Sequence, residues 1–184
     1  MRSHFMFLWL ILATTLAGCA SLTPQQCVSG DWQGIGFGDG VAGRQADFIN
    51  AHREACSEVG VVPDYEAWLR GRAAGLQQYC TPQNAYIIGR NGNRMSPVCS
   101  PDQRYSLNNA YDWGFQYYEL DVDINEAERE IARIEAVILV ELSHPDLTPA
   151  EADRRARLMF DIRQLESSIR IDERRQRRFA RLPS

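Results

Sequence analysis

Hydrophobic residues in the second half of the chain recur every three or four positions, which is the spacing of one face of an α-helix. One stripe runs from Ile124 to Ile138 and a second from Leu158 to Phe179, with charged residues between the apolar ones. Stripes this narrow are typical of a seam between two packed helices. Because only a short connection around Pro145 separates them, we predict a long antiparallel helical hairpin over residues 101–184, with arms of about 27 residues and 40 Å.

Capping signals mark the start of each arm of this hairpin. Ser100 and Gln103 form one capping box, Thr148 and Glu151 form another, and a proline follows the cap residue in both cases. The first stripe is broadened near the turn by apolar residues that one partner helix cannot cover. These residues are Val137, Leu139, Val140 and Leu142. The alternatives for their cover are the disulfide-bonded region, a second copy of the chain and a partner protein.

The region before the hairpin, residues 27–100, is predicted to be a small disulfide-bonded helical head. Helical spacing is found from Ala46 to Cys56 and again from about Pro63–Asp64 to Tyr79. The glycines between Gly30 and Gly43 indicate an irregular loop, because closely spaced glycines are typical of turns. Tyr86–Ile88 and Met95–Val98 flank Asn91–Gly92, which favours a short β-hairpin. The predicted fold class is therefore mainly α.

The first 18 residues have the layout of an export signal. Arg2 gives a positive start, and the apolar run from Phe5 to Ala13 is too short to span about 30 Å of hydrocarbon. The segment Leu16–Cys19 then resembles the lipobox of bacterial lipoproteins. That resemblance implies that the leader is cleaved before Cys19, that this cysteine carries diacylglycerol and an N-acyl chain such as palmitate, and that residues 19–26 form a lipidated tether. Because Ala20, not aspartate, follows Cys19, the resemblance also favours the periplasmic face of the outer membrane.

With Cys19 assigned to lipid, the other four cysteines form an even set, which in an oxidising compartment predicts two disulfides. They are Cys27, Cys56, Cys80 and Cys99. Pairing Cys56 with Cys80 is disfavoured, because a helix of about 24 Å separates them if their helices form a hairpin. Of the two remaining arrangements, we favour Cys27–Cys56 with Cys80–Cys99, since the second bridge would close the predicted β-hairpin. The other arrangement remains open.

Charge and composition limit the function classes. The 184-residue chain has a net charge of −4, and all 20 of its basic residues are arginine. A mildly acidic chain argues against general nucleic-acid binding. Arginines are dense between Arg170 and Arg181, which favours a hydrated helix end, with contact to anionic lipid or an acidic partner as the alternative.

Few residues combine into recognisable chemistry. His52 and Cys56 lie one helical turn apart but lack further metal ligands, and the glycine run from Gly34 to Gly40 lacks the lysine of a phosphate-binding loop. We therefore expect no metal and no cofactor. Carboxylates near the predicted glycine loop could serve as an acid–base pair for glycan cleavage, with aromatic side chains lining a sugar groove. These are Asp31, Asp39, Asp47, Asp64 and Glu66, with Trp32, Phe37, Trp68 and Tyr79.

A longer pattern of glycines, aromatics and cysteines is similar to a family of uncharacterised bacterial lipoproteins defined by a domain of unknown function. The similarity covers residue 27 to about residue 120. It includes Cys27, Asp31–Trp32, Gly34, Asp39–Gly40, Gly43, Phe48, His52, Cys56, Gly60, Pro63–Asp64, Gly71–Arg72, Gly75–Leu76, Tyr79–Cys80, Gly89, Gly92 and Cys99. The resemblance implies location and disulfides but no activity. We therefore expect a lipid-anchored envelope protein with a structural, protein-binding or wall-binding role, with self-association through the hairpin as one form of partnership. The alternative is a periplasmic glycan-processing enzyme.

Overall fold

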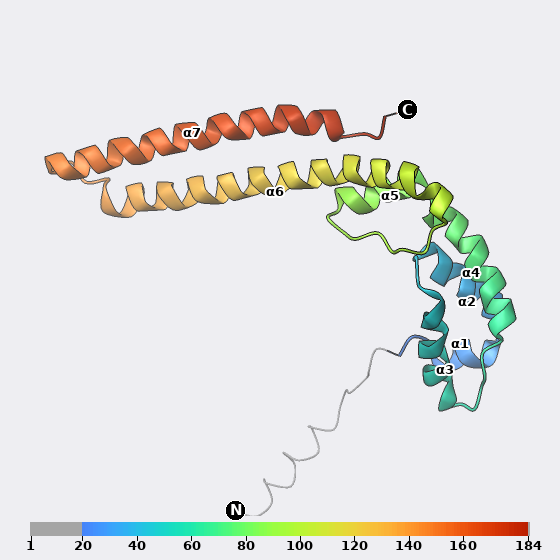
Figure 1. Ribbon diagram of the computed structural model, residues 1–184. Helices are drawn as coiled ribbons and strands as arrows, with labels where there is room; N and C mark the ends of the chain where they lie inside the picture. The colour runs from blue at the N-terminus through green and yellow to red at the C-terminus, as the bar shows by residue number, and fades with distance from the viewer. Residues whose placement is uncertain (1–19, 184) are drawn as a thin grey trace, which may run out of the picture. The chain divides into compact units, whose positions relative to one another are not determined.

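The computed structural model describes residues 20–183, so the predicted signal peptide and Cys19 lie outside the described residues. The chain divides between Gln77 and Gln78 into two compact units. Unit 1 contains α1 (Pro24–Ser29), α2 (Trp32–Val41), the 3-10 turn η1 (Ala46–Phe48), α3 (Ile49–Ser57) and most of α4 (Tyr65–Tyr79). Unit 2 contains α5 (Pro82–Arg90), the 3-10 turn η2 (Pro101–Gln103), α6 (Arg104–Glu141) and α7 (Pro149–Phe179) (Figure 1).

The core of unit 1 forms around a disulfide. Cys27 in α1 is bonded to Cys56 in α3, and their Cα atoms are 5.5 Å apart. Both sulfurs are fully buried in a cluster with other apolar side chains of the unit. The cluster also contains Leu22, Trp32, Ile49 and Trp68. The pairing is the one that the sequence favours, and it fixes the short helix α1 against α3.

The glycine-rich segment is a helix, so the prediction of an irregular loop was wrong. Asp31 begins α2 by accepting a hydrogen bond from the Gly34 amide, 2.9 Å away. Of the glycines in this segment, only Gly30 and Gly43, which flank the helix, have a positive φ. Two of those inside α2, Gly36 and Gly40, serve a different purpose, because they leave the helix surface bare for a neighbouring backbone.

The neighbouring backbone is that of α4, and the contact is reciprocal. A Cβ added at Gly36 would overlap the Trp68 carbonyl oxygen in α4, and one added at Gly40 would overlap the Arg72 carbonyl oxygen. A Cβ added at Gly71 in α4 would likewise overlap the Gln33 carbonyl of α2. Each glycine in a helix costs about 1 kcal/mol relative to alanine. Here the close approach of the two helices offsets that cost.

The same reciprocal glycine contact is found in unit 2, between α5 and α6. A Cβ at Gly89 would overlap the Tyr111 carbonyl, and one at Gly114 would overlap the Tyr86 carbonyl. The predicted β-hairpin is therefore absent, and residues 20–183 contain no strand. Thr81 caps α5, and the Asn91–Gly92 pair, read as a hairpin turn from sequence, ends the helix with Gly92 at φ 68°. An Asn–Gly pair supplies a residue with left-handed backbone both in a β-hairpin turn and at the end of a helix, which is why the sequence wrongly predicted a hairpin here.

The irregular segment after α5 is closed by the second disulfide. Cys80 is bonded to Cys99, with a Cα–Cα distance of 5.6 Å. The Tyr79 hydroxyl accepts a hydrogen bond from the Ser96 amide at 2.7 Å, and the Gln103 side chain donates to the Cys80 carbonyl. These bonds hold residues 91–100 without regular secondary structure.

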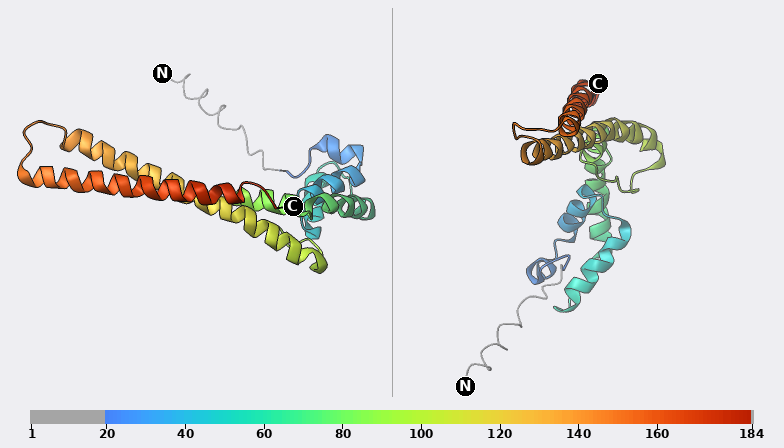
Figure 2. Two further views of the ribbon diagram at one scale, coloured as in Figure 1. Left: turned by 90° about the horizontal axis from the view of Figure 1, so that it is seen from above. Right: turned by 90° about the vertical axis from the view of Figure 1, so that its left-hand side faces the viewer.

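The helical hairpin predicted from the two stripes is present, with arms of 38 and 31 residues (Figures 1 and 2). Both predicted capping boxes are formed, at Ser100 with Gln103 and at Thr148 with Glu151. Hydrogen bonds from Thr148 lower the pKa of the Glu151 carboxyl below its ordinary value. Arg154 pairs with Glu141 at 2.7 Å, which places the start of α7 beside the end of α6.

The far end of α7 is fastened by side chains of α5 and α6. The Tyr86 hydroxyl donates to the Phe179 carbonyl at 2.8 Å, and the Trp113 indole donates to the Arg181 carbonyl at 2.9 Å. The Phe179 ring also packs edge-on against Trp113, with centroids 4.7 Å apart. Carbonyls at a helix C-terminus lack donors within the helix, so Tyr86 supplies one for Phe179, while Trp113 holds the residues just after α7.

The glycine contact in unit 1 yields a matched pair of substitutions. Gly36→Ala should lower the free energy of unfolding by about 2 kcal/mol or more, since α2 and α4 must separate to admit the methyl group. Gly38→Ala is the control, because Gly38 lies in the same helix with nothing within 4 Å of an added Cβ. It should be neutral or stabilise by up to about 1 kcal/mol. Denaturant unfolding under non-reducing conditions measures both, and equal effects would contradict the packing account.

Candidate functional site

A chain of hydrogen bonds links four polar side chains inside unit 1. The Asp39 carboxylate oxygen Oδ2 lies 2.7 Å from His52 Nε2 and accepts a hydrogen bond from the Trp68 indole at 2.8 Å. The other imidazole nitrogen, His52 Nδ1, lies 2.9 Å from the Ser21 hydroxyl. His52 is 1% exposed and Trp68 is 0% exposed. We call these four residues the Ser21–His52 network.

Local folding positions each member of the network. Asp39 belongs to α2 and Trp68 to α4, the two helices that the glycine contacts hold together. His52 lies on the buried face of α3, one turn before the disulfide-bonded Cys56. Ser21 precedes α1. The network therefore connects all four helices of unit 1 or the segments next to them.

The network contains the residue types of a hydrolase triad but not the arrangement of one. In such triads the serine is bonded to His Nε2 and the acid to Nδ1, whereas here the two nitrogens have the opposite partners. A substrate would also have to reach an imidazole that is almost completely buried. The geometry supports a structural role: the network satisfies buried polar groups and fixes Ser21 to the core.

The carboxylates proposed for glycan cleavage are not brought together as an acid–base pair. Asp31 caps α2, and Asp64 accepts a hydrogen bond from the Ala67 amide at the start of α4. Asp39 is bonded within the network, while Asp47 and Glu66 are exposed. Of the four aromatic residues suggested for a sugar groove, only Phe37 is exposed, at 39%. Trp32, Trp68 and Tyr79 are buried and cannot stack on a ligand.

The predicted pair of metal ligands has other partners. The Cys56 sulfur is bonded to Cys27, and both imidazole nitrogens of His52 lie at hydrogen-bond distance from other side chains. Among residues 20–183 no group of three or more potential ligands could hold a metal ion.

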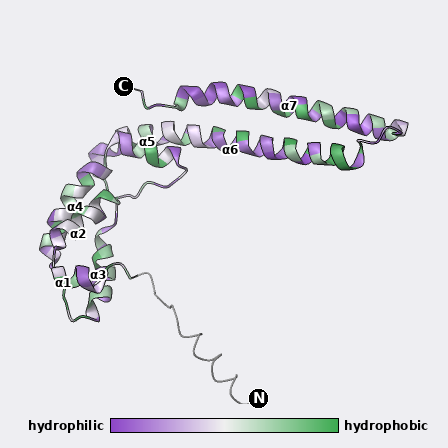
Figure 3. Ribbon diagram, turned by 180° about the vertical axis from the view of Figure 1, so that it is seen from behind, coloured by the Kyte–Doolittle hydropathy of each residue, from purple (hydrophilic) through white to green (hydrophobic). Residues whose placement is uncertain are grey.

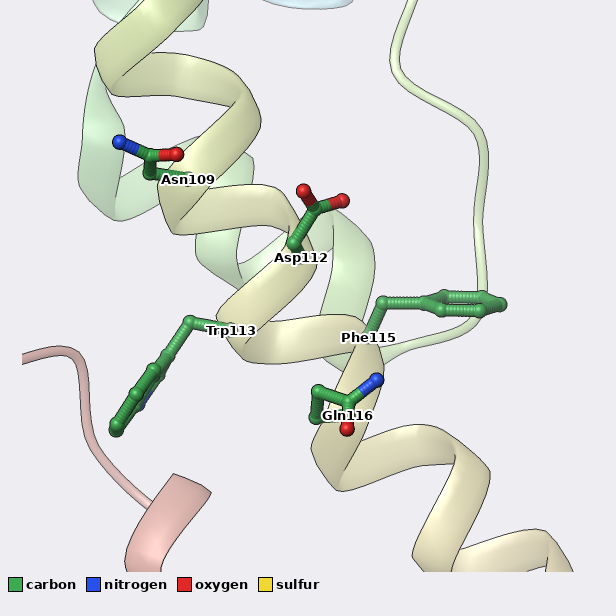
Figure 4. Close-up of a pocket in the computed structure, with 5 residues that line it drawn as sticks. All are labelled: Asn109, Asp112, Trp113, Phe115 and Gln116. Atoms are coloured by element: carbon green, nitrogen blue, oxygen red, sulfur yellow. The ribbon is translucent and has the colours of Figure 1, made fainter.

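A shallow hollow of about 510 Å³ lies on α6 in unit 2. It is lined by Asn109, Asp112, Trp113, Phe115 and Gln116 (Figure 4). Trp113 points toward the C-terminal segment to which its indole is bonded, and Phe115 points to the other side of the helix. The lining side chains diverge and do not converge on one point, so the hollow does not define a ligand site.

In the basic C-terminal stretch, Arg175 pairs with Asp172 and Arg178 lies over the Trp113 ring.

Sequence reasoning identified three members of the network, but for other roles. The sequence suggests Asp39 as a catalytic acid, His52 as a metal ligand and Trp68 as part of a sugar groove, and it gives no indication of Ser21. The available signal was the spacing of His52 and Cys56, which places the imidazole on the buried face of α3. A buried histidine needs partners for both nitrogens.

Over residues 20–183, fold and site together define a disulfide-bonded, mainly helical protein with a small network-stabilised unit and a long helical hairpin. Residues 31–116 match the family model described as "Protein of unknown function (DUF2799)". No curated protein and no solved structure was found to match the chain. The matched region begins at the cap residue of α2 and ends just after Gly114 in α6, so it contains both sets of reciprocal glycine contacts.

The structural role of the Ser21–His52 network can be tested through Asp39. Asp39→Ala removes the acceptor for the Trp68 indole and the partner of His52 Nε2, so the free energy of unfolding should fall by about 3 kcal/mol. Asp47→Ala removes an exposed carboxylate in the same unit and should change it by less than about 0.5 kcal/mol. Chemical denaturation measures both. A wild-type value for Asp39→Ala would show that the network does not stabilise unit 1.

Proposed function

We propose that this protein is a lipid-anchored cell-envelope protein with a structural or binding role, held at the periplasmic face of the outer membrane. The supporting observation is the use of its cysteines. Four of the five are paired in two disulfides, and the fifth, Cys19, ends the segment that resembles a lipobox. Within residues 20–183, no helix has both the length and the apolar character needed to cross a bilayer.

The binding role is supported by the apolar side chains that the hairpin leaves uncovered. Leu142 is buried at 1% exposure, but Leu139 and Val140, three and two residues earlier, are 71% and 81% exposed. Figure 3 shows hydrophobic residues gathered at this end of α6. Large apolar side chains that stay exposed side by side are typical of protein–protein contact sites. The proposed partner is a second envelope protein with an apolar contact surface.

Lipidation can be tested on protein from its native host. Mass spectrometry of the N-terminal peptide should show Cys19 as the first residue, carrying a diacylglycerol thioether and an N-acyl chain. Cys19→Ala should leave the leader uncleaved at this position and abolish labelling by radioactive palmitate. Ser29→Ala, also exposed and near the N-terminus, is a control that should label like wild type. An unmodified thiol at Cys19 would overturn the proposal.

Partner binding can be tested by site-specific photocrosslinking in living cells. A photoreactive amino acid at Val140 should give adducts with a distinct envelope protein, because its side chain is uncovered. The same amino acid at Gln164, which is exposed in α7, should give few. Adducts of twice the chain mass would show self-association instead, and equal yields at both positions would contradict a specific surface.

A further inference from the structure

The N-terminal end of the described chain is fixed to the core of unit 1 from Ser21 onward. The Ser21 hydroxyl is bonded to the buried imidazole of His52, and Leu22 is 7% exposed within the core cluster. Thr23 then caps α1 through a complete capping box. Each of these three consecutive residues is held by a different interaction, so the chain is anchored by side chains before its first helix begins.

This arrangement limits the distance between unit 1 and a lipid attached to Cys19. Only Ala20 separates Cys19 from Ser21. An extended chain spans at most about 3.6 Å per residue, so the two Cα atoms of Cys19 and Ser21 are within about 7 Å of each other. The headgroup layer of a bilayer is itself about 5–7 Å thick on each side. A unit fixed at Ser21 therefore has no length of free chain with which to stand away from the membrane.

The side chains next to the fixed end are suited to a membrane interface. The Phe48 ring packs edge-on against His52, with centroids 5.0 Å apart, and the Arg44 guanidinium lies 4.5 Å from the Phe48 centroid. Arg44 is exposed and has no ion-pair partner among residues 20–183. The nine-tenths-buried Arg72 donates a hydrogen bond to the Arg44 carbonyl at 2.8 Å and holds this segment in place. An aromatic ring beneath an unpaired arginine fits the boundary between acyl chains and phosphate groups.

We propose that unit 1 lies directly on the bilayer, with the surface formed by Arg44 and Phe48 facing the lipid phosphate groups. The inference rests on the proposed lipid anchor, but it adds a defined contact surface. The three fixed residues Ser21, Leu22 and Thr23 then convert a flexible lipid attachment into a fixed orientation. The partner of this surface is the headgroup layer of the membrane that holds the anchor.

Hydrogen exchange on the intact lipoprotein in vesicles containing anionic lipid tests this surface. Amides of residues 44–53 should exchange severalfold more slowly than in the same protein in detergent, while those of residues 150–160 should not change. A ten-residue Gly/Ser linker between Ala20 and Ser21 has a root-mean-square span of about 17 Å, beyond the Debye length of about 8 Å at physiological salt. It should remove the protection of residues 44–53.

The matched control is the same linker placed after Asp146, in the connection between α6 and α7, which leaves the anchor distance unchanged and should retain the protection. Ser21→Ala frees one further residue at most, because Leu22 stays buried and Thr23 still caps α1, so this variant should retain most of the protection. Protection that survives the Ala20 linker, or none in the wild type, would overturn the inference. The acyl mass of the Cys19 peptide is read from the same samples, so a missing lipid, which refutes the proposed function, is distinguishable from a lipidated protein whose unit 1 stands free.

Discussion

Direct backbone contact between paired helices is the constraint on which the structure depends. In unit 1, glycines of α2 and α4 face each other's carbonyl oxygens, and in unit 2 a glycine of α5 and one of α6 do the same. A methyl group at any of these positions would push the helices apart. Because α2 and α5 are short helices, this close approach supplies packing that larger side chains supply elsewhere. The domain match covers both contacts, whereas most of the hairpin lies outside it.

The polar network in unit 1 is a consequence of this contact. When α2 and α4 touch, Asp39 and Trp68 come within hydrogen-bond distance, and the disulfide between α1 and α3 brings His52 to the same point. A polar network of this kind is favourable only when every member is satisfied. The described residues contain no buried side-chain nitrogen or oxygen without a partner. The network therefore depends on the packing and in turn restricts it to one arrangement.

Local signals in the sequence predicted much of this fold. The two stripes, both capping boxes and the favoured disulfide pairing are all present, because each depends on residues close in sequence or on simple helix geometry. The glycine-rich helix and α5 were misread because glycine and Asn–Gly have the same local preferences in turns, in helix ends and at helix contacts. Only the neighbouring helix decides between these uses. The network was missed for the same reason, since Ser21 and His52 have no relation in sequence that indicates their contact.

The hairpin shows how a helix with little burial can still be held in place. No residue of α7 is buried, so its seam with α6 alone gives modest stabilisation along its length. Contacts at its ends add to this seam: the Arg154–Glu141 pair joins the start of α7 to α6, and the donors from Tyr86 and Trp113 hold its end. A helix held at both ends but thinly packed between them can keep its direction while its apolar side chains, such as Met159 and Phe160, remain exposed. The contacts that hold the hairpin together and the apolar side chains that stay exposed are thus compatible, because they lie in different parts of α6 and α7.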